Sequence, residues 1–333
     1  MNSYINNKTI LLTGGTGSFG KKFIDNTVSR FRPKQIIVYS RDEMKQWDLE
    51  ISLKDKGIKK VKFIIGDVRD KEKVLSSMRG VDIVVHAAAT KIVTSAEKNP
   101  FEAIKTNIIG AVNVIESSIQ NKVKKVIALS TDKACNPINL YGATKLASDK
   151  LFISSNFSNE TDKTVFSVVR YGNVMGSRGS IIPFFQSLKN KKTLPITDIE
   201  MTRFMISLDE GVDLVWRAIK ESFGGEIFVK KIPSMKIIDI AKTISPESSL
   251  RVIGIRPGEK IHEQMISEDD SINTYEFDDY FKIIPHDQFL NKKIKKKLIA
   301  NGKKVKKGFS YTSNNNKKWM TKDQLSNWIN KSL

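Results

Sequence analysis

Short apolar runs rich in β-branched residues recur through the first half of the chain, and longer stretches of mixed polarity separate them. Nearly continuous apolar runs are typical of strands that are buried on both faces of a parallel sheet. We therefore expect strands at residues 9–14, 35–40, 61–68, 81–88, 125–130 and 165–174.

The stretches between these runs have helical length, as at residues 20–31, 71–80 and 100–121. This alternation predicts an α/β fold with a doubly wound parallel sheet, the Rossmann arrangement. After about residue 175, Pro and Gly interrupt the pattern, which indicates a smaller and interrupted C-terminal region. The helix-like stretch 207–222 is expected to pack back onto the main sheet.

The chain is basic, with 56 Lys and Arg against 36 Asp and Glu among 333 residues. The lysines gather most densely at residues 291–307, in a run that lacks the interleaved aromatic and arginine residues of a nucleic-acid-binding surface. We expect a solvated, lysine-rich surface and no nucleic-acid partner.

Other function classes have little support in the composition. Cys135 is the single cysteine, which excludes an intramolecular disulfide, and the three histidines lack metal-ligand spacing. Apolar runs stay well below the roughly 18 residues that span a bilayer, and the first residues lack the apolar segment of a signal peptide. We expect a cytoplasmic protein without a bound metal or a membrane partner.

A glycine-rich turn follows the first strand and leads into a helix, in the sequence TGGTGSFG. Glycines at this position permit a tight turn and let backbone N–H groups reach a pyrophosphate at the helix N-terminus. The motif predicts a dinucleotide site that includes Gly14, Thr16, Gly17, Ser18, Phe19 and Gly20.

The ends of the next strands indicate which dinucleotide binds. The second strand ends in Ser40 and Arg41, and an arginine here accommodates the 2′-phosphate of NADP. Asp42 and Glu43 follow directly, so NAD stays open as the less favoured cofactor. Further contacts are expected from the ends of the third and fourth strands, at Asp67, which is also a candidate helix N-cap, Val68, Ala87, Ala88 and Ala89.

The fifth strand leads into the stretch STDKACNPINLYGATK, which combines a carboxylate, two amines and a phenol. Ligands of open α/β sheets bind at the carboxyl ends of the strands, where Thr131, Asp132 and Lys133 fall. Tyr141 and Lys145 are four residues apart and share one face of the next helix. A lysine cation beside a phenol is expected to lower the pKa of the tyrosine.

In these motifs the chain resembles the extended short-chain dehydrogenase/reductase family, and within it the inverting UDP-N-acetylglucosamine 4,6-dehydratases. The resemblance runs through nearly the whole chain, in TGGTGSFG, YSRDE, GDVRD, STDKA, NPINLYGATK, VVRYGNV, GSRGS, PITD, MTRF, GGEIFV, KIPSMK, IRPGEK and HE. It implies an NADP-binding Rossmann domain of residues 1–174 and 206–226. It also implies a UDP-sugar-binding region of residues 175–205 and 227–333.

The resemblance also implies roles for residues. Tyr141 takes the C4 hydroxyl proton of the sugar while hydride passes to NADP, and Thr131 and Lys145 orient this step. Asp132 protonates the C6 leaving group, and Lys133 transfers the C5 proton, where retaining dehydratases carry a glutamate. A basic Lys133 requires burial or nearby cations that lower its pKa. Asn107 joins Tyr141 and Lys145 in the cofactor site.

The substrate implied by the resemblance is UDP-N-acetylglucosamine, at the start of pseudaminic acid synthesis. Its contacts would be Lys91, Asn173, Arg178, Thr197, Met201, Arg203, Arg256 and Glu259. Ile92 departs from the family, whose members usually carry a histidine there. Relatives form homo-oligomers, expected to be hexamers. A UDP-sugar epimerase, a dehydratase for capsule L-sugars and a non-catalytic NADP sensor are the alternatives.

Overall fold

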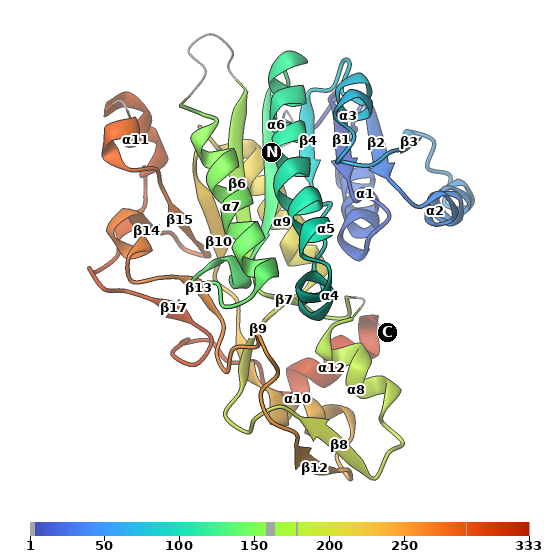
Figure 1. The fold of residues 1–333 in the computed structure, drawn as a ribbon, viewed down its shortest axis with the longest axis vertical. Helices are drawn as coiled ribbons and strands as arrows, with labels where there is room; N and C mark the ends of the chain where they lie inside the picture. Colours follow the sequence, from blue (N-terminus) through green and yellow to red (C-terminus); the bar gives the residue numbers. More distant parts are fainter. Residues whose placement is uncertain (1–3, 158–163, 178, 291, 333) are drawn as a thin grey trace.

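The structure is a computed structural model that describes residues 4–157, 164–177, 179–290 and 292–332. Its largest element is a ten-stranded sheet, which occupies the upper part of Figure 1. The six apolar runs form strands of this sheet, as predicted: β1 (Thr9–Thr13), β2 (Gln35–Ser40), β3 (Val61–Ile65), β4 (Ile83–His86), β5 (Lys125–Thr131) and β6 (Val165–Tyr171).

The strands are ordered β3-β2-β1-β4-β5-β6-β10, and every neighbouring pair in this part of the sheet is parallel. This order confirms the predicted doubly wound Rossmann arrangement. The sheet continues past β10 (Ile227–Lys230) through three antiparallel strands, β15 (Tyr280–Ile283), β14 (Thr274–Glu276) and β16 (Lys303–Lys304). It therefore extends into the segment from residue 227 that was assigned to the substrate region.

Helices cover both faces of the sheet. α1 and α9 pack together on one face, and α9 also contacts β5 and β6, as predicted for residues 207–222. α3, α6 and α7 form a contiguous layer on the other face (Figure 1). The helices of this part are α1 (Ser18–Arg30), α2 (Glu43–Asp55), α3 (Lys71–Ser77), α4 (Val93–Lys98), α5 (Pro100–Ile104), the π-helix η1 (Lys105–Ile109), α6 (Gly110–Gln120), α7 (Leu140–Ser154) and α9 (Leu208–Glu221).

A smaller region lies below the sheet in Figure 1 and has a core of its own. Met201, Ile240 and Leu325 are among its buried residues, and burying each such side chain stabilises the fold by about 1.5–3 kcal/mol. Its helices and its parallel strand pair are α8 (Ile181–Ser187), α10 (Ile237–Ile244), α12 (Lys322–Ser332), β8 (Thr193–Ile196) and β12 (Ser249–Val252).

Short elements connect this region to the main sheet. One small sheet contains β7 (Asn173–Val174), β9 (Thr202–Ile206) and β11 (Ser234–Lys236). Another pairs β13 (Gln264–Ile266) with β17 (Tyr311–Thr312). The remaining short helices are η2 (Asp132–Ala134), η3 (Asp270–Asn273), η4 (Asp287–Phe289) and α11 (Lys292–Leu298).

Candidate active site

A cavity of about 1070 Å³ lies at the carboxyl ends of the parallel strands, between the main sheet and the smaller region. Its lining contains every predicted site residue that the structure describes, with the exception of Asn107. Arg178, a predicted substrate contact, lies outside the described residues. The main sheet and the smaller region, each with a core of its own, thus bring segments from the whole chain to one site.

The glycine-rich turn has the shape that a dinucleotide requires. Gly14 has φ +68°, and a Cβ there would lie 2.9 Å from the Ala88 backbone, so only glycine fits between β1 and β4. A Cβ on Gly20 would lie 2.3 Å from the Gly15 carbonyl oxygen, which shows how closely α1 packs on the turn. α1 begins at Ser18, and Gly17 offers its N-terminal amides no side-chain acceptor. These amides can therefore bind a pyrophosphate.

Polar side chains that follow β2 and β3 also line the cavity. The Asp42 carboxylate accepts from the Lys45 amide at the start of α2 and pairs with the Lys45 amine. Asp67 was a candidate helix N-cap, but Asp70 caps α3 instead. Asp67 accepts from the Arg69 backbone and guanidinium, and Arg41 lies 3.7 Å away. Cations therefore balance both carboxylates.

Asn107, a predicted cofactor contact, makes its hydrogen bonds within the protein. Its side chain is 1% exposed and is not part of the cavity lining. Its amide oxygen accepts from the Thr90 backbone at 2.8 Å, and its amide nitrogen donates to the Thr90 carbonyl at 3.0 Å and to the Thr144 hydroxyl at 3.0 Å. Asn107 thus joins the loop after β4 to α7, and it supports the site without lining it.

The chain between β5 and α7 is held in a compact turn. The Asn139 side chain caps α7 by accepting from the Gly142 amide at 2.8 Å. A Cβ on Gly142 would lie 2.2 Å from the Lys133 carbonyl oxygen, so only glycine allows α7 to start this close to η2. The helix thereby places Tyr141 and Lys145 beside Thr131, Asp132 and Lys133 in the cavity wall.

The pKa of Tyr141 corrects a prediction from the sequence. Burial raises it to about 12, because the low-dielectric wall disfavours the phenolate. The Lys133 cation and a hydrogen bond with Thr131 act in the opposite direction without offsetting burial. Burial also lowers the pKa of Lys145.

Two carboxylates and two cations lie close together in the cavity wall: Asp132, Glu263, Lys133 and Arg203. Lys133 Nζ lies 3.1 Å from Asp132 Oδ1 and 3.1 Å from Glu263 Oε1. Arg203 Nε lies 3.6 Å from the same Glu263 oxygen. Glu263 belongs to the HE pair that marks the resemblance, but spacing alone gives it no role, so it was missed as a site residue.

Each member of this cluster changes its neighbours' protonation. Burial, and then the charge of Glu263, raise the pKa of Asp132. Burial alone would raise the pKa of Glu263, but the Lys133 and Arg203 cations outweigh it and hold that pKa below its ordinary value. Burial would likewise lower the pKa of Lys133, but Asp132 and Glu263 raise it instead. A resting base at Lys133 requires the opposite shift.

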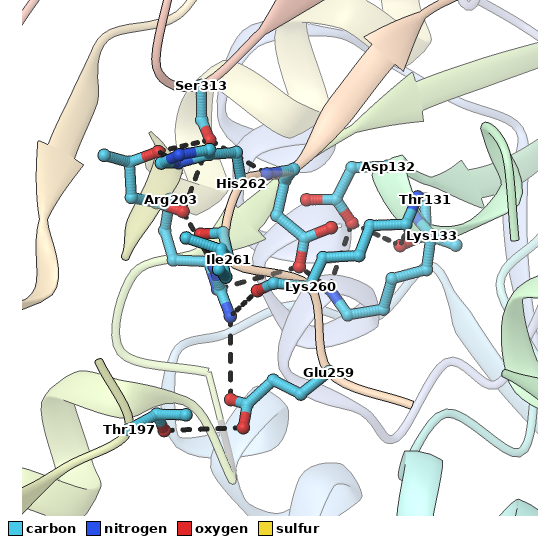
Figure 2. Close-up of polar contacts among 12 residues, drawn as sticks. Thr131, Asp132, Lys133, Thr197, Arg203, Glu259, Lys260, Ile261, His262 and Ser313 are labelled. Atoms are coloured by element: carbon cyan, nitrogen blue, oxygen red, sulfur yellow. Dashed lines mark hydrogen bonds and ion pairs between the residues drawn. The ribbon is translucent and has the colours of Figure 1, made fainter. Parts of the chain in front are cut away.

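Arg203 makes more hydrogen bonds within the protein than is expected of a residue that contacts a substrate phosphate. Its guanidinium donates to the backbone carbonyls of Thr202, Ile261 and Lys260 at 2.8–3.0 Å (Figure 2). It also lies 3.5 Å from Glu259 Oε1, while the Thr197 hydroxyl donates to Glu259 Oε2 at 3.4 Å. Arg203 therefore fixes the loop that carries Glu263.

Other predicted substrate contacts keep polar atoms at the cavity. Arg256 is exposed, and its ion pair with Glu259 is long, at 3.9 Å. Asn173 Oδ1 is buried without a hydrogen-bond partner among the described residues. Lys91, Met201 and the departing residue Ile92 also line the cavity.

Among the described residues, no group of three or more His, Cys, Asp or Glu side chains could hold a metal ion. In the same part of the chain, no helix has the length and apolar character needed to cross a membrane.

A doubly wound sheet, a glycine-rich dinucleotide turn and a Tyr-x-x-x-Lys pair in one cavity are typical of extended short-chain dehydrogenases/reductases. Residues 10–285 match the sequence profile of a family described as "Polysaccharide biosynthesis protein". The chain belongs to this family.

Full-length relatives agree with this placement. A UDP-N-acetylglucosamine 4,6-dehydratase (inverting) from Campylobacter jejuni is 53% identical over 330 residues, which cover 98% of each chain. A UDP-glucose 4-epimerase from Rickettsia bellii is 44% identical over 320 residues, 93% of this chain and 92% of the relative. The X-ray structure of Pen from Bacillus thuringiensis is 37% identical, covers 99% of each chain and superposes with a TM-score of 0.88.

Proposed function

We propose that the protein is a C5-inverting UDP-N-acetylglucosamine 4,6-dehydratase that uses NADP. The observation that carries the proposal is the pair Asp132 and Lys133, which lines one cavity with Tyr141 and Lys145. Oxidation of a sugar needs only the Tyr/Lys pair, whereas loss of water also needs an acid and a base. The similarity to the Campylobacter dehydratase, at 53% identity over 98% of both chains, supports the same substrate.

The dinucleotide turn fits the cofactor, which would supply a reversible hydride acceptor and the positive charge of the oxidised nicotinamide. Tyr141 takes the proton of the C4 hydroxyl, and Thr131 links it to the acid. The Thr131 hydroxyl is hydrogen bonded with Tyr141 and donates to Asp132 Oδ1 at 2.9 Å. The proton gained at C4 can therefore replace the one that Asp132 gives away at C6.

The 4-ketone makes the C5 proton acidic, and Lys133 is the group that moves this proton. Asp132 protonates the C6 hydroxyl, which then leaves as water. Its Oδ1 accepts from Thr131 and Lys133, while Oδ2 is buried without a partner in the described part of the chain. The pKa of Asp132 is raised by burial, so the protonated form that a general acid needs is favoured.

The remaining parts of the proposal concern the substrate, the assembly and the compartment. Asn173, Arg256 and Lys91 would contact the UDP-sugar, and Arg256 suits a diphosphate because its guanidinium binds such anions in a bidentate manner. We place the enzyme in the cytoplasm as a homo-oligomer, a hexamer by resemblance, at the first step of pseudaminic acid synthesis.

A UDP-sugar 4-epimerase is the second candidate, because relatives with that name are 44% identical over most of the chain. Mass spectrometry of the product from UDP-N-acetylglucosamine separates the two activities. We expect a product that has lost one water molecule. An isomer of unchanged mass would favour the epimerase and reject the dehydratase.

The NADP proposal predicts the effect of Arg41→Ser. Because a hydrogen bond to a charged group contributes about 1.5–3 kcal/mol, we expect the Kd for NADP to rise at least ~10-fold. The Kd for NAD, which lacks the 2′-phosphate, should change much less. Calorimetric titration of both cofactors into both proteins measures this, and wild-type protein that prefers NAD would reject the proposal.

A further inference from the structure

The raised pKa of Lys133 leaves the proposed C5 base without a way to lose its proton. Asp132 cannot take that proton, because it is itself the acid that must stay protonated for the leaving group. Outside these two residues, the described carboxylate in contact with the amine is Glu263, 3.1 Å from Nζ. Glu263 therefore lies where a proton acceptor for Lys133 would have to lie.

Several features suit Glu263 to this task. The residue is 2% exposed and lines the cavity, and its Oε2 is buried without a partner among the described residues. Its backbone is fixed, since its amide donates to the Ser313 hydroxyl at 2.9 Å and its carbonyl accepts from the Ser313 amide at 2.8 Å. Arg203 holds the adjoining loop from the other side (Figure 2). The carboxylate is thus rigidly aimed at the amine.

The geometry points to Glu263 as the proton acceptor that converts the Lys133 ammonium into a free amine for the C5 step of the proposed reaction. An N–H bond of Lys133 breaks, an O–H bond forms at Glu263, and the ion pair becomes a neutral pair. The amine then takes the C5 proton as the C6–O bond breaks and Asp132 protonates the departing hydroxyl. Because the reaction inverts C5, the reduced intermediate must present the other face of C5 to the ammonium, which then protonates it, and Glu263 returns its proton to the amine.

The test compares Glu263→Gln with wild-type protein on UDP-N-acetylglucosamine, followed by ultraviolet absorbance of the reduced nicotinamide and by product analysis. Oxidation at C4 does not use Glu263, so we expect it to persist and reduced cofactor to accumulate. Dehydration should fall at least ~100-fold, the usual size of a general acid–base contribution. Glu263→Asp, which keeps a carboxylate, should recover part of that loss.

The pH profile separates a proton acceptor from a structural carboxylate. Asp132, Tyr141, Arg203 and Lys260 are the other charged or titratable groups that face the Lys133–Glu263 pair. In wild type the proton moves between Lys133 and Glu263 without leaving the pair. The rate of dehydration should therefore not change with pH over the range in which the pair holds one proton. In Glu263→Gln the ammonium must lose its proton to solvent, so the residual rate should rise with pH.

Glu226→Gln is a matched control, because Glu226 is also fully buried but lies outside the cavity and accepts from the Gly224 amide at 2.9 Å. It should lower the Tm without changing the ratio of oxidation to dehydration. Equal loss of both steps in Glu263→Gln, or an unchanged dehydration rate, would overturn the inference. Wild-type protein that fails to dehydrate the sugar would reject the proposed function instead, so the two failures are distinguishable.

Discussion

Replacing Tyr141 by Phe is expected to lower kcat for UDP-N-acetylglucosamine by about 1000-fold, within the usual range for removal of a general base. The variant lacks the hydroxyl that takes the C4 proton, so oxidation stops before the 4-ketone forms. Reduced cofactor and dehydrated product should both form about 1000-fold more slowly than in wild type. Rapid-mixing absorbance and steady-state product assays measure both quantities on the same protein.

Tyr311→Phe is the control for the tyrosine variant. Tyr311 is also buried, but its hydroxyl donates to the Ile232 carbonyl at 2.9 Å, away from the cavity. Removing this hydroxyl should lower the Tm and leave kcat nearly unchanged. A Tyr141→Phe protein that reduces its cofactor at the parental rate would show that another group takes the C4 proton.

Replacing Lys133 by Met should leave C4 oxidation in place and lower dehydration by about 1000-fold, because the C5 proton then lacks its carrier. Reduced cofactor and the 4-keto sugar should accumulate together. This pattern differs from Tyr141→Phe, which stops the first step. Quenched-flow product analysis distinguishes the two variants directly.

The Met side chain also removes one of the two cations that, among the described residues, form ion pairs with the buried Glu263 carboxylate and leaves only Arg203 at 3.6 Å, which destabilises a fold. The double variant Lys133→Met with Glu263→Gln removes both charges and should regain Tm over Lys133→Met alone without regaining dehydration. That outcome would separate the loss of chemistry from the loss of stability. Dehydration at the wild-type rate in Lys133→Met would reject the role of the lysine.

Much of the fold could be predicted because its signals are local. A strand buried on both faces needs an unbroken apolar run, and β1, β2 and β5 have such runs in the sequence. The glycine turn was equally visible, since its glycines stand at a regular spacing between the first strand and the first helix. Tyr141 and Lys145 were recognisable because helical spacing places them on one face.

The features that sequence could not supply depend on contacts between distant segments. Glu263 follows Lys133 by 130 residues (263 − 133), and it reaches the amine because β13, which directly follows it, packs against η2. Arg203 carries the motif of a phosphate contact, but loop carbonyls occupy its donors. The directions of the Tyr141 and Lys133 pKa shifts follow from burial and from neighbouring charges, which spacing does not give.

The configuration at C5 tests the central claim most directly, because it separates a C5-inverting dehydratase from a retaining dehydratase and from an epimerase. The measurement is NMR of the product formed from UDP-N-acetylglucosamine in D2O. We predict a 6-deoxy-4-keto sugar of L-arabino configuration that carries deuterium at C5. A dehydrated product that keeps the C5 configuration of the substrate, or UDP-N-acetylgalactosamine formed without loss of water, would contradict it.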